Sequence, residues 1–279
     1  MKRKVMNNCA MAFCFIAVIV ALVPLVSILL DIAIKGGRCL NLNFFIHTPR
    51  PSGETGGGMA NAIVGTLTLI GLASLWSIPL GILTGIYLGE FGSNRFGEFL
   101  RVALDVMGGI PSIVIGIFAY IIFVIPMKTF SAWAGGFALG IIMLPVVART
   151  TEEMIRMVPL EIREAAWALG ITPFHTIWHI VLRSAVPGII TGIILGIARI
   201  IGETAPLLFT AFGNMFWHHS LNQPIAALPL QVFTYAVSPY DDWHRQAWAG
   251  SFVMVLLVCI MSIIARLIIE RGFTKTSLK

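Results

Sequence analysis

The sequence predicts an all-α integral membrane protein with six transmembrane helices. Hydrophobic residues make up 57% of the 279-residue chain and charged residues only 11%, whereas soluble domains carry roughly 25% charged residues. The apolar stretches are long enough for helices that cross a bilayer, which need about 20 residues each. They do not alternate between apolar and polar residues as half-buried strands do. We therefore expect one transmembrane domain over residues 1–279.

Six apolar stretches account for the expected spans. The first, about 10–34, follows a basic N-terminus, but its uncharged part of about 22 residues exceeds the 7–15 residue apolar region of a cleaved secretory signal. The second and fifth, about 60–89 and 185–211, are longer than a bilayer requires, so we expect a tilt or a break in each. The remaining spans are expected at about 102–125, 132–149 and 249–269.

The distribution of basic residues predicts the orientation of the chain. With a cytoplasmic N-terminus, most of the 19 Lys and Arg residues lie on the cytoplasmic side. The outer loops then hold only Lys35, Arg38, Arg50, Lys128 and Arg245. By the positive-inside rule both termini are expected to be cytoplasmic. The net charge of +6 mostly reflects this asymmetry, so it does not indicate a nucleic-acid partner.

Three stretches between the spans are long enough to have functions of their own. The outer loop 35–58 is rich in Gly and Pro and is expected to be a flexible linker. The outer loop 212–248 is aromatic and broken by prolines. We expect it to lie at the membrane interface or to re-enter, with Trp243 and Trp248 as interfacial anchors. The cytoplasmic segment 150–184 carries two short helical pieces and is expected to dock a partner.

Several catalytic and metal-binding arrangements are missing from the sequence. No lysine follows a glycine, which excludes a GxxxxGK(S/T) phosphate-binding loop, so any ATP would bind to another chain. HTIWH places His175 and His179 on one helix face, but Thr176 stands where a zinc hydrolase has its glutamate. The four cysteines have neither metal-site nor disulfide spacing and are expected to be buried free thiols. We expect no catalytic residue, metal or cofactor in this chain.

The stretch ARIIGETAPLLFTA, residues 198–211, places Arg199 and Glu203 near the middle of the fifth span. An arginine at the centre of a membrane helix costs about 2.5–3.5 kcal/mol, whereas an exposed i, i+4 ion pair returns only about 0.2–0.5 kcal/mol. The pair must therefore face protein or a water-filled cavity. It is either a buried salt bridge that sets helix packing, or an oxyanion site in which Glu203 holds Arg199, a permanent bidentate donor. Thr204 and Pro206 predict a helix break that exposes polar backbone to a cavity.

Other polar residues of the spans allow two interpretations each. Arg149, at the expected end of the fourth span, is either an anchor paired with a neighbouring glutamate or a contact at the cytoplasmic mouth of an anion path. Asp105 is expected to be a helix cap or an inter-helix partner, and Asn61 a helix cap rather than a ligand. Ser112 is expected to pack in a Pro-broken helix, because the chain has no GxSxG motif around it.

The segment EAAWALGITPFHTIWHIVL, residues 164–182, resembles the EAA loop of the permease subunits of ABC importers. Six positions match the pattern of that loop: Glu164, Ala165, Ala166, Gly170, Ile180 and Leu182. Arg183 replaces its closing proline, and Pro187 follows four residues later. Further stretches between about 56 and 240 resemble the phosphate-specific (PstA-type) permeases: GGGMANAIVGTL, GIPSIVIGIF, ARTTEEMIRMVP, ARIIGETAPLLFTA and QPIAALPLQVFTYAVSP.

This resemblance implies a type I ABC importer permease fold with cytoplasmic EAA coupling helices. It implies a second homologous permease subunit, two ATPase subunits that bind ATP and Mg, and an extracytoplasmic phosphate-binding protein. The location would be the cytoplasmic membrane of a bacterium or archaeon. The translocation path would be lined by Arg199, Glu203 and Thr204, with Arg149 nearer its inner end. The residues implied in ATPase coupling are Glu164, Ala165, Ala166 and Gly170.

Two other functions fit part of the sequence. A permease for another oxyanion, such as sulfate or molybdate, would use the same arginine chemistry. An ATP-independent secondary transporter or channel could use Arg199 and Glu203 as an ion- or proton-coupled site. The segment 150–184 argues against the second alternative, because such a transporter has no ATPase to dock. An intramembrane hydrolase would need the zinc motif or the catalytic triad that the sequence lacks.

Overall fold

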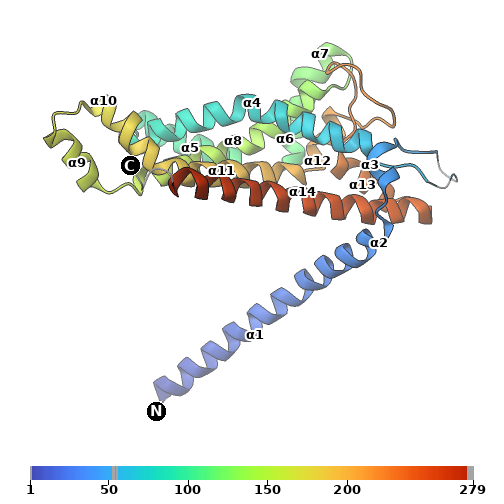
Figure 1. The fold of residues 1–279 in the computed structure, drawn as a ribbon, viewed down its shortest axis with the longest axis horizontal. Helices are drawn as coiled ribbons and strands as arrows, with labels where there is room; N and C mark the ends of the chain where they lie inside the picture. Colours follow the sequence, from blue (N-terminus) through green and yellow to red (C-terminus); the bar gives the residue numbers. More distant parts are fainter. Residues whose placement is uncertain (1, 52–53, 55, 275–279) are drawn as a thin grey trace.

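The computed structural model describes residues 2–51, 54 and 56–274, and regular structure in this part is helical apart from one β-bridge between Phe212 and Ile225 (Figure 1). The long helices are α1 (Lys2–Asp31), α4 (Ala60–Glu90), α8 (Ala132–Arg156), α11 (Leu182–Ile201) and α14 (Asp241–Thr274). The shorter elements are η1 (Ile32–Gly36), α2 (Gly37–Cys39), α3 (Leu42–Ile46), α5 (Arg95–Gly109), α6 (Ser112–Ala119), η2 (Tyr120–Val124), α7 (Ile125–Met127), α9 (Leu160–Ala168), α10 (Pro173–His175), η3 (Thr176–Val181), α12 (Ala205–Thr210) and α13 (Leu228–Ala236), where η denotes a π-helix.

Helices α4, α8, α11 and α14 run side by side and form a bundle with two ends (Figure 1). The hairpin of α9 and α10 projects from one end, called the α9 end, and α3 and α13 lie near the opposite end, called the α13 end (Figure 1). The first residues of α1 and the last residues of α14 both point toward the α9 end, as an even number of spans requires (Figure 1).

The described part of the chain has five candidate spans, or six if one bent helix pair counts as a span. Five helical runs are long and apolar enough to cross a membrane: Met6–Cys39, Ala60–Glu90, Ala132–Arg156, Pro173–Ile201 and Asp241–Ile264. The candidate for a sixth span is the pair Arg95–Gly109 and Ser112–Met127, which bends by 100°. The break lies at Pro111, which caps α6 and cannot continue α5. Ser112 thus sits in a Pro-broken helix, as expected, whereas the second span, α4, is continuous.

Helix α8 is the centre of the bundle because glycines bring two neighbours close to it. On α4, a Cβ at Gly85 would lie 2.4 Å from the Cβ of Thr151. On α11, a Cβ at Gly192 would lie 2.6 Å from the Cβ of Thr150. Both helices carry glycines at four-residue spacing along this contact, which is the small-residue packing typical of membrane helices. The six glycines are Gly81, Gly85, Gly89, Gly188, Gly192 and Gly196.

The α13 end is closed by the chain that follows α12. At the start of α8, the amide of Ser131 donates to the carbonyl of Thr210, the last residue of α12 (3.0 Å), and the amide of Ala132 donates to the carbonyl of Leu221 (2.9 Å). The amide of Leu228, at the start of α13, donates to the hydroxyl of the buried Thr66 on α4 (2.8 Å). The apolar centre of the 212–248 loop therefore re-enters the bundle as α13. Trp243 stacks on the buried Tyr235 with ring centroids 4.5 Å apart, so its ring also packs inside the chain.

Two expectations for the α13 end were wrong. The described part of the 35–58 loop forms α2 and α3 rather than a flexible linker, because Asn41 caps α3 and the amides of Met59 and Ala60 donate to carbonyls of this loop. Asn61 is not a cap, since it lies inside α4 and is fully buried. Its side chain donates to the carbonyl of Asn214 (2.7 Å) and so holds the loop that follows α12.

Helix α1 diverges from the bundle and is exposed along most of its described length (Figure 1). Its cysteines, Cys9 and Cys14, are exposed, and so is Cys259 on α14. The expectation of buried thiols was therefore wrong for these three residues, because their helix faces are not covered by this chain. Cys39 is half-buried, and all four thiols are free.

Candidate functional site

The fifth span breaks beside Arg199. Helix α11 ends at Ile201, and the chain turns through Gly202 before α12 begins at Ala205. Glu203 and Thr204 are therefore outside both helices, and the break predicted from Thr204 and Pro206 is confirmed. The carbonyl of Thr204 accepts from the amides of the first turn of α12.

Arg199 and Glu203 do not form an ion pair in the part of the chain that the structure describes. The i, i+4 contact expected from the sequence requires a continuous helix, and the helix ends between the two residues. The structure therefore contains neither a buried salt bridge between Arg199 and Glu203 nor a contact by which Glu203 holds Arg199. Arg199 is exposed on the surface of this chain, and Glu203 is half-exposed.

Arg199 lies near the middle of the bundle, not at either end. One turn before it, Gly196 faces Met143 and Val147. Met143 is close to the centre of α8, which spans Ala132–Arg156. A helix rises 1.5 Å per residue, so Arg199 is only about 4.5 Å further toward the α13 end. The break thus places a permanent charge and non-helical backbone at mid-depth.

A second group of charges lies nearer the α9 end, around Arg149. Its Nη2 is 2.5 Å from Oδ1 of Asp105, and its Nε donates to the same oxygen (3.2 Å). Its Nη1 donates to Oε2 of Glu152 (3.1 Å), and its Nη2 also donates to the carbonyl of Arg101 (3.0 Å). Every nitrogen of this guanidinium has a partner. The anchoring pair with a nearby glutamate and the inter-helix role of Asp105 are thus present.

Glu152 is the centre of this ionic cluster, defined as Arg101, Asp105, Arg149, Glu152 and Arg156. Its side chain is only 4% exposed and accepts from Arg101 (2.7 Å), Arg149 and Arg156 (3.0 Å). Arg101 also donates to the carbonyls of Leu88 and Gly92 at the end of α4 (3.0 and 2.8 Å). The cluster therefore joins α4, α5 and α8. Sequence reasoning missed Arg101, although it stands one helical turn before Asp105.

The two groups of charges occupy different depths. Gly192 faces Thr150, which is next to Arg149, and Arg199 is seven residues further along α11. Seven residues of helix correspond to about 10 Å. The structure thus places Arg199 and Arg149 in successive layers rather than in one site.

The EAA segment forms a compact turn at the α9 end. Helix α9 ends at Ala168, and Gly170 adopts φ +76°, a conformation that favours glycine. The amide of Gly170 donates to Trp167 (2.9 Å) and that of Ile171 to Ala166 (3.1 Å), which together form a Schellman motif. Ala166 is buried, whereas the other three predicted coupling residues are exposed: Glu164, Ala165 and Gly170. A π-helix then continues into α11 without a break, despite the missing proline.

A buried ion pair that the sequence did not reveal ties α9 to α4. Nη1 of Arg163 donates to both carboxylate oxygens of Glu90 (2.6 and 2.5 Å), and both side chains are largely buried. Nη2 of Arg163 donates to the carbonyl of Ile155 on α8 (3.1 Å). Large apolar side chains nearby remain uncovered, as expected of a docking surface: Met157, Leu160, Trp167, Leu169, Phe174 and Trp178.

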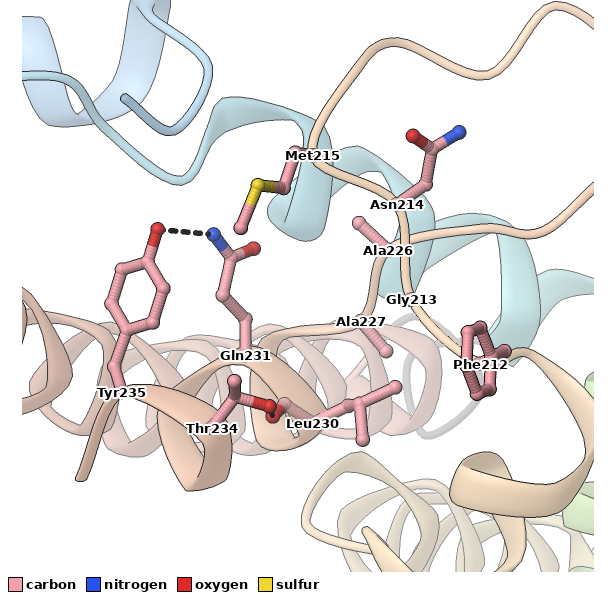
Figure 2. Close-up of a pocket in the computed structure, with 10 residues that line it drawn as sticks. All are labelled: Phe212, Gly213, Asn214, Met215, Ala226, Ala227, Leu230, Gln231, Thr234 and Tyr235. Atoms are coloured by element: carbon pink, nitrogen blue, oxygen red, sulfur yellow. Dashed lines mark hydrogen bonds between the residues drawn. The ribbon is translucent and has the colours of Figure 1, made fainter. Parts of the chain in front are cut away.

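A hollow of about 200 Å³ opens at the α13 end (Figure 2). Figure 2 shows that the side chains around it are apolar or neutral, with one hydrogen bond between Gln231 and Tyr235 (3.3 Å). Burial raises the pKa of Tyr235 above its ordinary value. Because no cation lines this hollow, it is not suited to hold an oxyanion. Arg199 and Arg149, which lie deeper in the bundle, remain the candidates that the sequence marked.

Comparisons with known proteins agree with this architecture. The profile of a family described as "Binding-protein-dependent transport system inner membrane component" matches residues 77–274. The chain is 42% identical to the phosphate transport system permease protein PstA of Haemophilus influenzae over 270 residues, which cover 96% of this chain and 95% of that protein. It is 45% identical to PstA of Pasteurella multocida over 267 residues, covering 95% of each. It is 35% identical to PstA 1 of Mycobacterium tuberculosis over 278 residues, covering 96% and 90%.

Solved ABC transporters share the fold at low sequence identity. A chain of a bacterial alginate ABC transporter, solved with an alginate-loaded periplasmic protein, superposes with a TM-score of 0.65 at 14% identity and covers 91% of each chain. A chain of the inward-facing MetNI methionine ABC transporter gives a TM-score of 0.59 at 17% identity, covering 76% of this chain and 96% of that one. The all-helical importer permease fold expected from the sequence is confirmed.

Proposed function

The chain belongs to the binding-protein-dependent transport system inner membrane component family, and we propose that it is the permease subunit of an ATP-driven importer of inorganic phosphate. It is a multi-pass inner-membrane protein. As a permease component it binds no cofactor of its own, and the ATPase is a separate subunit. Relatives that span nearly the whole chain are phosphate transport permeases, and this supports phosphate over sulfate or molybdate.

The observation that carries the proposal is the environment of Arg199. Its guanidinium is permanently charged and exposed at mid-depth of a membrane protein, beside a helix break. A charge in that position requires a partner outside this chain or a water-filled path. We propose that Arg199 lines the path for phosphate, with Glu203 and the backbone around Thr204 beside it. A guanidinium donates two parallel hydrogen bonds to an oxyanion, which suits phosphate.

We further propose a second homologous permease subunit, which would cover the exposed side of α11 and complete the path. In this arrangement the α9 end is cytoplasmic, so both termini are cytoplasmic. The α13 end faces the extracytoplasmic phosphate-binding protein. Arg149 then lies toward the inner end of the path.

We propose that the α9–α10 hairpin is the docking site for the ATPase. The uncovered apolar side chains of the α9–α10 hairpin would dock into one ATPase subunit through the surface around Glu164, Ala165 and Gly170. Because Arg163 of α9 binds Glu90 of α4, motion of the hairpin would pull directly on a membrane span. ATP binding and hydrolysis would thereby switch the path between its two sides.

The experiment is uptake of labelled phosphate into vesicles that contain the purified transporter, with and without ATP inside. We expect uptake that requires ATP and the binding protein, and an ATPase that co-purifies with this chain. Sulfate and molybdate in tenfold excess should compete poorly. Uptake without ATP would support a secondary transporter, and uptake of sulfate or molybdate instead of phosphate would support the other oxyanion importers.

A further inference from the structure

We propose that Asp105 is a resident anion on Arg149: its carboxylate occupies the guanidinium edge that phosphate needs at the α9 end of the path, and phosphate passes by displacing it. This inference rests on the proposed function, and it assigns a positioning role to a residue that the sequence marked only as a packing partner.

The geometry of the Arg149 contacts supports an exchange at one edge. Nε and Nη2 form one edge of the guanidinium, and both approach Oδ1 of Asp105 (3.2 and 2.5 Å). An edge with two parallel N–H groups is the arrangement that binds an oxyanion in a bidentate manner. The remaining nitrogen, Nη1, is held by Glu152 (3.1 Å). Arg149 can therefore exchange Asp105 while Glu152 and the carbonyl of Arg101, which accepts from Nη2 (3.0 Å), keep it in place.

Exposure decides which carboxylate leaves. The side chain of Asp105 is 65% exposed, whereas that of Glu152 is 4% exposed. Water and salt screen an exposed pair, so its net attraction is small. Glu152 is buried and also accepts from Arg101 and Arg156, so its loss would leave buried charges unpaired. An arriving anion should therefore replace Asp105 and leave Glu152 bound.

Charge balance favours a transient exchange rather than permanent capture. The ionic cluster holds three arginines and two carboxylates. Without Asp105 it would carry two net positive charges and would bind phosphate tightly. With Asp105 as a competitor tethered a few ångströms away, phosphate binds less strongly and leaves sooner. The carboxylate thus limits trapping at the last arginine of the path.

The exchange also affects the broken span. Asp105 is one helical turn before Gly109, where α5 ends. Arg101, one turn earlier, stays attached to Glu152 and to the end of α4. Displacement of Asp105 would therefore remove the ionic link between the last turn of α5 and α8, while the base of α5 remains anchored.

The test is inhibition of ATP-driven uptake by phosphate on the side of the α9 end, in vesicles that contain the complete transporter. We compare wild type with Asp105→Asn, which removes the charge and keeps the size. The concentration of phosphate that halves uptake should fall about two- to fivefold, the range of an exposed Asp–Arg pair. The maximal uptake rate should also fall, because phosphate leaves Arg149 more slowly.

Two variants separate charge from packing. Asp105→Glu keeps the carboxylate and should leave the inhibitory concentration close to that of wild type. Asp31→Asn breaks the exposed pair of Asp31 with Lys35 at the end of α1 (3.2 Å) and should change nothing. If Asp105→Asn does not assemble with the ATPase, Asp105→Ser takes its place.

The proposal is overturned if Asp105→Asn leaves the inhibitory concentration unchanged, or if Asp105→Glu shifts it as much as Asp105→Asn. If instead the proposed function is wrong, wild-type vesicles would take up another anion and not phosphate, which is a different result from an unchanged inhibitory concentration. The same variants can in that case be titrated with the anion that is transported.

Discussion

The middle of the bundle and its α9 end differ in how their arginines are paired. At mid-depth, Arg199 is exposed beside a helix break and has no ionic partner in the described part of the chain. At the α9 end, Arg101 and Arg149 are bound to Glu152 and Asp105 within the same chain. Arg199 therefore needs an opposite charge from outside the chain, whereas the arginines at the α9 end find most of theirs within it.

This difference separates the transport role of Arg199 from the structural role of the buried Glu152, which holds the subunit together. A charge left without a partner in a membrane protein is expensive, so it is retained where a substrate or a partner subunit supplies the opposite charge. A buried charge with several partners mainly fixes the helices that carry it. Variants in the two regions should therefore fail in different assays.

The largest expected effect is on Arg199. Arg199→Gln should abolish phosphate uptake, because glutamine has no charge to offset that of phosphate at mid-depth. The ATPase should still co-purify with the variant, since Arg199 is exposed and makes no hydrogen bond or ion pair within the described chain. Labelled-phosphate uptake and subunit composition are measured on the same preparations. Normal uptake would mean that Arg199 is a packing residue, and the search for the site would move to Arg149 and the second permease.

Glu152 should show the opposite pattern. Glu152→Ala removes a buried carboxylate from among three arginines, and the loss of one partner of a buried ion pair costs about 3–5 kcal/mol. We expect a lower yield of assembled transporter and a markedly lower apparent Tm in detergent. Glu153→Ala is the matched control, because Glu153 is exposed on the next position of the same helix. Equal thermal stability of the two variants would contradict the structural role of the cluster.

The pair of Glu90 and Arg163 lies between these extremes, because it joins the docking hairpin to a span. Glu90→Gln should leave the ATPase bound and hydrolysing ATP, while phosphate imported per ATP falls about tenfold, within the usual range of coupling between two sites. The ratio of uptake to hydrolysis is measured in vesicles. Glu98→Gln, at an exposed position of α5, should keep the wild-type ratio. An unchanged ratio in Glu90→Gln would show that the hairpin transmits motion by another route.

Much of the fold could be predicted from the sequence because its causes are local. Hydropathy locates the spans, the EAA segment locates the coupling hairpin, and Pro111 and Pro206 mark the two breaks. The limit of local reasoning is visible at Arg199 and Glu203. Their spacing indicates an ion pair only if the helix continues, and the helix ends at Ile201.

The contacts that the sequence did not reveal are long-range. Glu90 and Arg163 are 73 positions apart and Arg101 and Glu152 are 51 apart, so no spacing rule connects them. Asn61 is of a residue type that often caps helices, but its side-chain amide instead donates to a carbonyl of the loop that follows α12. Tertiary packing decides where a buried amide finds its acceptor. In each case the partner is determined by which helices α8 brings together.

The smallest predicted effect concerns the backbone that presents the docking surface. Gly170 ends α9 with φ +76°, and a side chain added there would meet nothing within 4 Å. Gly170→Ala should therefore cost only the strain of a left-handed backbone, about 1 kcal/mol. If the hairpin must keep this turn to bind the ATPase, the affinity for the ATPase should fall about fivefold.

Gly170→Asn should restore most of this affinity, because asparagine tolerates the left-handed region. Gly37→Ala, at another open position but with an ordinary helical φ of −61°, should leave binding unchanged. A loss in Gly170→Asn equal to that in Gly170→Ala would mean that the ATPase contacts the glycine itself, and the effect would then belong to the interface rather than to the turn.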